Sequence, residues 1–210
     1  MTNDLIQDEL AEFKAFFQKY GRFVVYGLLA AAIVVGGTFY YHRYEARRSL
    51  LAAALYNEML EAASQQRPGL ATVAGHKLEH SFAATPYAGQ GALLLARLDY
   101  EQNRIPGAII NLKFAAHHAR ESTIRIVARL RLAALLLAQG HAHKAWAYAH
   151  IARPYGFKAM ALGLQAQILA REGKNVAAYK AYGEAIKLAP KKSTLTVLWR
   201  REQAQLPVSP

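Results

Sequence analysis

The sequence of 210 residues contains no cysteine, which excludes disulfides and thiolate metal sites. Acidic residues are also scarce, because 14 Asp and Glu stand against 26 Lys and Arg and leave a formal net charge of +12. Only seven prolines occur, and the segments between them are of helical length. β-branched residues seldom alternate with polar ones, whereas alanine and leucine dominate. These features predict an all-α protein.

The excess of positive charge suits nucleic acid, an anionic membrane surface or an acidic protein partner. Residues 42–210 alone hold 23 Lys and Arg against 10 Asp and Glu. One cluster of arginines lies at the start of a predicted helix. The sequence shows neither a DNA-recognition helix nor a set of aromatic residues for base stacking beside it. We therefore expect no nucleic-acid binding and interpret the cluster as a solvated face, with anionic lipid or an acidic partner as the alternative. Its members are Arg120, Arg125, Arg129 and Arg131.

One apolar run, from Phe23 to Tyr41, has 19 residues without a charge, close to the ~20 residues that cross a bilayer as a helix. A signal peptide has a shorter apolar region, a basic lead and a small-residue cleavage site. Here residues 1–22 carry four acidic residues, and aromatic residues stand at both ends of the run, as at membrane–water interfaces. We predict an uncleaved span over residues 23–41 that contacts the lipid bilayer; a buried helix of a soluble domain is the alternative.

Two properties of the predicted span stay open. Three basic residues flank it on each side, so the positive-inside count does not decide its orientation. Small residues inside the span permit close approach of a second helix and hence a homodimer, but such residues are common in single spans as well. The flanking residues are Lys14, Lys19, Arg22, Arg43, Arg47 and Arg48, and the small ones are Gly27, Ala31, Gly36 and Gly37.

Three later segments, residues 92–116, 129–152 and 162–190, repeat one pattern of small residues at spacings of 37 and 33. Small residues on facing sides of two antiparallel helices allow close packing. Asn103, Gly140 and Gly173 stand at the turns, where they accept the left-handed conformation that ends a helix. The expected packing residues are Ala96, Ala108, Ala115, Ala133, Ala145, Ala152, Ala166, Ala178, Tyr182 and Ala185.

This pattern resembles the tetratricopeptide repeat, a unit of 34 residues that forms two antiparallel helices. The last copy matches best, whereas Asp99 replaces an expected large apolar residue in the first. The resemblance implies a transmembrane helix followed by a right-handed superhelix of antiparallel helix hairpins. Residues 42–190 would form a stalk helix and about four hairpins. The stalk helix is expected because neither glycine nor proline interrupts the chain between Thr38 and Arg67. Residues 191–210 would form a capping helix and tail, with Leu195, Leu198 and Trp199 facing inward.

The first helices of such repeats would line a concave surface. Mixed apolar and arginine side chains at these positions suit an extended or helical peptide of a partner. The alternative is that Leu130 and Leu137 belong only to the core. The candidate groove residues are Leu93, Arg97, Tyr100, Leu130, Leu137, Gln167 and Arg171.

The stretch HKLEH, from His76 to His80, has the form seen in inverted zinc peptidases. Two histidines at i and i+4 share a helical face, and Glu79 could act as the base, but a third ligand is not evident. Phosphate-binding and dinucleotide-binding glycine motifs and a nucleophile elbow are absent from the sequence. We therefore expect no enzyme, cofactor or metal site, and keep zinc hydrolysis at His76 and His80 as the enzymatic alternative.

The order of the parts is more specific than any single motif. An acidic lead runs into Phe16-Phe17 and Gly21, a single span follows, and Thr85-Pro86 opens the second hairpin. This order resembles the YfgM-type family, the ancillary subunits of the bacterial SecYEG translocon, over residues from about Glu12 to Ile186. The chain departs from that family in its strongly basic charge and its extended C-terminus.

The resemblance implies a single-pass protein of the bacterial inner membrane, with residues 1–22 as a cytoplasmic lead and the repeat domain in the periplasm. It implies association with the SecYEG translocon and with a membrane-anchored periplasmic chaperone of the prolyl-isomerase type. The implied role is non-enzymatic: handing secreted proteins to periplasmic chaperones, together with restraint of an envelope-stress response. The alternative is a cytosol-facing tetratricopeptide adaptor, or a basic protein that assembles on the inner leaflet.

Overall fold

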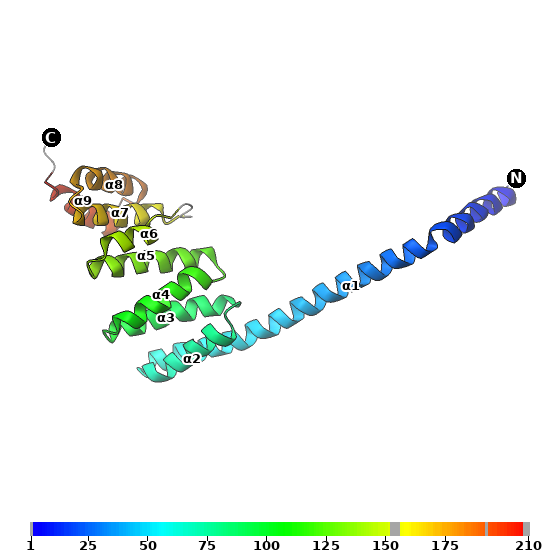
Figure 1. Ribbon diagram of the computed structural model, residues 1–210, viewed down its shortest axis with the longest axis horizontal. Coiled ribbons are helices and arrows are strands. Elements are labelled where there is room, and N and C mark those ends of the chain that lie inside the picture. The colour runs from blue at the N-terminus through cyan, green and yellow to red at the C-terminus, as the bar shows by residue number, and fades with distance from the viewer. Residues whose placement is uncertain (1, 152–155, 192, 208–210) are drawn as a thin grey trace. The chain divides into compact units, whose positions relative to one another are not determined.

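The computed structural model describes residues 2–151, 156–191 and 193–207, and within them it contains helices and no strand (Figure 1). The prediction of an all-α protein is therefore confirmed. The helices are α1 (Thr2–Ser64), α2 (Pro68–Ser81), α3 (Pro86–Glu101), α4 (Ile105–His118), α5 (Ser122–Ala138), α6 (Ala142–Ala149), α7 (Lys158–Arg171), α8 (Asn175–Leu188) and α9 (Thr194–Ala204).

The chain divides into two units that meet between Arg48 and Ser49, and helix α1 contributes to both. Within the first unit α1 is long and apolar enough, by length and composition, to cross a membrane. None of its most apolar window is buried against the described residues. At the end of the run Arg43 lies over the ring of Phe39, with 5.2 Å between the guanidinium carbon and the ring centroid. An apolar surface of this extent suits an apolar environment such as lipid.

The second unit begins with the last turns of α1, which pack on α2 and α3 through Ala52, Met59 and Ala62. Helices α3 and α4, α5 and α6, and α7 and α8 form further hairpins, and α9 packs on α8. The first helix of each hairpin also contacts the first helix of the next, so α3, α5 and α7 form one layer. Figure 1 shows these hairpins stacked in chain order. This arrangement presents the first helices as a common surface.

The hairpin turns use the left-handed conformation that the sequence predicts. Asn103, Gly140 and Gly173 have φ of 58°, 79° and 74°. The residue after each of them donates its backbone N–H to a carbonyl five residues earlier, which closes the end of the helix. Gln66 (φ 56°) makes the same turn after α1, and the sequence did not mark it because glutamine rarely adopts this conformation. These hydrogen bonds are Arg67 to Ala62, Arg104 to Asp99, His141 to Leu136 and Lys174 to Leu169.

Small residues fill the contacts between these helices. The alanines on α3, α5 and α7 face alanines on the following helices, and Tyr182 of α8 closes the last hairpin. Ala152 lies outside the described residues. The buried members of the predicted set are Ala96, Ala108, Ala115, Ala133, Ala145, Ala166, Ala178, Tyr182 and Ala185.

Helix α9 covers the last hairpin with a different face from the one expected. Trp199 is buried together with Thr196, whereas Leu195 and Leu198 are 39 % and 42 % exposed, so the expected inward position was wrong for both leucines. The cause lies at the start of the helix. Ser193 caps it by accepting the Thr196 N–H at 3.2 Å, and the Thr196 hydroxyl donates to the Pro190 carbonyl at 3.0 Å. These bonds place residues 196 and 199, rather than 195 and 198, on the packed face.

Candidate partner-binding groove

Three cavities lie in a row along the layer formed by α3, α5 and α7, and we call them together the groove. The α3 cavity, of about 310 Å³, lies between α3, α4 and Arg131 of α5. The central cavity, of about 230 Å³, lies between α5, α7 and α9. The α9 cavity, of about 440 Å³, is lined by α5, α7, α8 and the segment from α9 to Leu206. Arg131 lines the first two, and Ala134 and Gln167 line the last two, so neighbouring cavities share walls.

The structure places every predicted groove residue on the lining of this groove. Tyr100 is 60 % exposed, so its ring is open to a partner. Leu130 is only 6 % exposed and packs mainly in the core, which agrees with the alternative kept for it. By cavity, the residues are Leu93, Arg97 and Tyr100 in the α3 cavity, Leu130 in the central cavity, and Leu137, Gln167 and Arg171 in the α9 cavity, with Gln167 also in the central one.

Sequence comparison between the copies missed two contributions to the groove. Arg131 stands in the column that holds Leu94 and Leu164 in the other copies, so the column suggests packing rather than surface. Helix α9 was expected to act only as a cap, yet Leu195 and Leu198 line the central cavity. Their exposure follows from the capping geometry at Ser193, which composition alone does not reveal.

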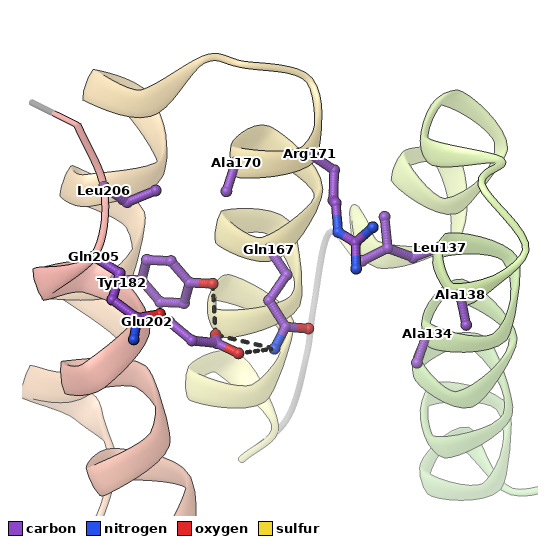
Figure 2. A pocket seen from close by; sticks show the side chains of 10 residues that line it. All are labelled: Ala134, Leu137, Ala138, Gln167, Ala170, Arg171, Tyr182, Glu202, Gln205 and Leu206. Carbon is purple, nitrogen blue, oxygen red and sulfur yellow. Dashed lines mark hydrogen bonds between the residues drawn. The ribbon is translucent and has the colours of Figure 1, made fainter.

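A hydrogen-bonded carboxylate joins three helices beside the α9 cavity (Figure 2). Tyr182 of α8 donates its hydroxyl to Glu202 Oε2 at 2.6 Å, and Gln167 of α7 donates Nε2 to both Glu202 oxygens at 3.2 and 3.3 Å. Burial, together with the hydrogen bond to Glu202, raises the pKa of Tyr182 above its ordinary value. Tyr182 therefore remains a neutral donor, and the charge of Glu202 is engaged by its own neighbours.

The arginines of the groove differ in their partners. Arg97 donates Nε to Glu101 Oε1 at 2.7 Å, one turn further along α3. In the part of the chain that the structure describes, Arg131 and Arg171 form no ion pair. Figure 2 shows Arg171 reaching from α7 toward Leu137 on α5. The groove thus combines apolar cavities with guanidinium groups that are available to a partner.

Two other arginines of the predicted solvated cluster, Arg125 and Arg129, have structural roles. Arg125 donates Nη1 to the carbonyls of Ala119 and Arg120 at 2.7 and 2.8 Å, beyond the end of α4. Arg129 donates Nη2 to the carbonyls of Ala147 and His150 at 3.1 and 3.4 Å, at the end of α6. Cations are favoured at these helix ends. The interpretation of the cluster as a solvated face was therefore wrong for Arg125 and Arg129.

The HKLEH stretch forms a local pair on α2. His76 Nδ1 lies 3.2 Å from Glu79 Oε2, and burial raises the pKa of Glu79 above its usual range. Among the described residues no group of three or more His, Cys, Asp or Glu side chains could hold a metal ion. The arrangement offers a histidine–carboxylate contact without a third ligand.

Stacked antiparallel hairpins whose first helices share one layer define a helical-repeat protein. The family model described as a tetratricopeptide repeat-like domain matches residues 14–202. The chain belongs to this family.

A relative supports the narrower resemblance that the order of parts suggested. The chain is 27% identical over 188 residues to a protein of Neisseria gonorrhoeae named "Ancillary SecYEG translocon subunit". The match covers 89% of this chain and 90% of that protein. It confirms the resemblance to the YfgM-type family over most of the chain.

Proposed function

We propose that the protein is a membrane-anchored, non-enzymatic scaffold that associates with the SecYEG translocon and binds segments of other proteins in the groove. The observation that carries this proposal is the row of three cavities with shared walls along α3, α5 and α7. A row of this kind suits an extended or helical segment rather than a small molecule. The likeness to the Neisseria protein, which covers nearly the whole of both chains, supports the translocon as the assembly.

The parts of the chain have distinct roles in this proposal. Residues 1–22 form a cytoplasmic lead, residues 23–41 cross the bacterial inner membrane, residues 42–190 form the repeat domain in the periplasm, and residues 191–210 cap it. The groove binds a membrane-anchored periplasmic chaperone of the prolyl-isomerase type, or the secreted proteins that pass to it. Handover at the translocon would also restrain an envelope-stress response.

Purification of the full-length protein from bacterial membranes in mild detergent tests the association. We expect the SecY, SecE and SecG subunits to be recovered with it, but not with an unrelated single-span protein carrying the same tag. Arg97→Glu combined with Arg171→Glu is expected to lose the groove-bound proteins, because it places two carboxylates beside the apolar cavities. Recovery of no translocon subunit, even after crosslinking in intact membranes, would contradict the proposal.

A matched control separates the groove from net charge. Lys113→Glu combined with Lys180→Glu makes the same change of charge on exposed residues of α4 and α8, outside the groove lining. We expect this control to retain the bound proteins. Equal losses from both double variants would mean that overall charge, and not the groove, holds them.

Cysteine labelling tests the orientation, since the chain has no native cysteine. We expect Gln139→Cys, at an exposed position after α5, to react with a membrane-impermeant maleimide in cells whose outer membrane is permeabilised. Asn3→Cys, in the lead, should react only after lysis. The reverse pattern would place the repeats in the cytosol and support the adaptor alternative instead.

A further inference from the structure

We propose that the groove selects acidic amphipathic segments, in which carboxylates and large apolar side chains recur on one face. This inference rests on the proposed function, because it takes the groove as the binding site and specifies the chemistry of its partner. Three observations support the inference: the positive charges on the lining, the apolar surface beside them, and the alternation of charged and apolar positions along the groove.

The groove presents more positive than negative charge. Arg131 and Arg171 are exposed and form no ion pair among the described residues, so each guanidinium can donate hydrogen bonds to a carboxylate of a partner. Within the described ranges Arg97 forms one ion pair, with the exposed Glu101 on its own helix, a contact that contributes little in water and that a partner can replace. Among the described residues that line the three cavities, Glu202 supplies the carboxylate, and it already accepts hydrogen bonds from its neighbours.

Apolar surface lies beside each of these arginines. Arg97 and Arg131 border the α3 cavity, whose walls include Leu93 and Leu112. Arg131 also borders the central cavity, where Met160, Leu195 and Leu198 leave apolar surface exposed. Arg171 borders the α9 cavity beside Leu137. Cationic and apolar positions therefore follow one another along the groove.

A protein segment matches this alternation better than the other anionic partners do. Guanidinium groups bind carboxylates with two parallel hydrogen bonds, and the intervening cavities take leucine-sized side chains. Nucleic acid would need phosphate contacts along a basic track and stacking on several aromatic residues. Of the described residues on the lining, Tyr100 alone is an exposed aromatic residue. Because these contacts are partly exposed, salt is expected to weaken them.

Fluorescence anisotropy with the full-length protein in zwitterionic detergent tests the inference. The probe is a labelled 16-residue peptide with leucine at helical spacing and glutamate elsewhere. One comparison peptide has lysine for every glutamate, and another has serine for every leucine. We expect the first peptide to bind at least about tenfold more tightly than either comparison peptide, with affinity that falls as salt increases.

Substitutions on the groove give the second arm of the test. Arg131→Gln combined with Arg171→Gln should weaken binding of the acidic peptide about tenfold or more, because two carboxylate contacts are lost. Lys113→Gln combined with Arg200→Gln removes the same charge at exposed positions outside the groove and should leave the affinity unchanged. Equal binding of the lysine peptide, or equal effects of both double variants, would overturn the inference.

Three further outcomes relate this inference to the proposed function. If no peptide binds while the protein still recovers the translocon subunits from membranes, the acidic-segment inference fails and the scaffold proposal stands. If short-chain phosphatidylglycerol, below its micelle concentration, binds in a manner that depends on Arg131 and Arg171 while the acidic peptide does not, the groove faces anionic lipid and the inference is likewise overturned. Loss of both peptide binding and translocon recovery would overturn both proposals.

Discussion

Gly163→Ala is expected to destabilise the second unit by about 3 kcal/mol, although alanine is the better helix former. A Cβ atom at Gly163 would overlap Cε2 and Cζ2 of Trp199, well inside van der Waals contact. Trp199 is 4 % exposed and is the largest apolar side chain that α9 packs on the last hairpin. Its buried ring has little space into which it can move, so the added methyl group must displace α9 or distort α7.

The decisive measurement is the same substitution in the absence of the tryptophan ring. Trp199→Ala alone should cost about 3–5 kcal/mol, because it leaves a cavity between α7 and α9. In that background Gly163→Ala should become neutral or stabilising by up to about 1 kcal/mol, since only the helix preference remains. The change in unfolding free energy caused by Gly163→Ala is therefore predicted to change sign when the Trp199 ring is removed. A simple loss of helix stability would not depend on Trp199.

Urea unfolding of the full-length protein in detergent, followed by circular dichroism, gives the free energies for this cycle. Gly69→Ala, in α2 with nothing within 4 Å of an added Cβ, is the matched glycine control and should not destabilise. Leu198→Ala, at a half-exposed position of α9, should cost much less than Trp199→Ala. An equal cost of Gly163→Ala with and without the Trp199 ring would contradict the proposed contact.

The pair also shows where the repeat pattern stops predicting structure. Gly163 occupies the column of Leu93 and Leu130, two groove residues of the earlier copies. In the last copy the space of that missing side chain is filled by Trp199 from α9. Comparison between copies aligns Gly163 with Leu93 and Leu130, and the sequence predicts that Trp199 faces inward. Only the packing of α9 in the structure shows that Trp199 fills the space above Gly163. The groove consequently changes character at its last repeat, where the cap contributes part of the wall.

Other features followed from local chemistry and were predictable for that reason. Asn103, Gly140 and Gly173 mark turns because few other residues tolerate positive φ, whereas Gln66 makes the same turn without such a signature. The seven groove residues fall on one surface because a helix of fixed period places them there. Arg131 was missed because its column is apolar in the other copies and its exposure depends on how neighbouring hairpins pack.

Asp99→Leu is the second substitution with a large expected effect. The repeat pattern expects a large apolar residue at this position, so the pattern alone favours leucine. The structure predicts a loss of about 3 kcal/mol or more instead, because Asp99 is buried and fully hydrogen-bonded. Its Oδ2 accepts from Asn111 Nδ2 at 2.8 Å, and its Oδ1 accepts from Arg104 Nε and Nη2 at 2.8 and 2.6 Å.

Three consequences of the substitution act in the same direction. The amide of Asn111, itself buried, would lose its partner, and a buried unpaired donor costs about 1–3 kcal/mol. Arg104 would lose its carboxylate at the turn between α3 and α4. The branched end of the leucine would also press on Gly107. The space there is narrow, because a Cβ atom built on Gly107 would lie 2.6 Å from Asp99 Oδ2.

A double-mutant cycle measured by urea unfolding separates the hydrogen bond from the volume. Asp99→Leu combined with Asn111→Leu removes both polar partners and should recover part of the loss, because no buried donor is then left unpaired. Glu101→Ala, two residues away on an exposed face, removes a carboxylate of the same helix and should change stability by less than about 0.5 kcal/mol. If Asp99→Leu were as stable as the natural chain, the position would be an ordinary packing position of the repeat. If it is destabilised and partly restored by Asn111→Leu, the aspartate and asparagine form a polar contact that this hairpin has in place of the apolar one.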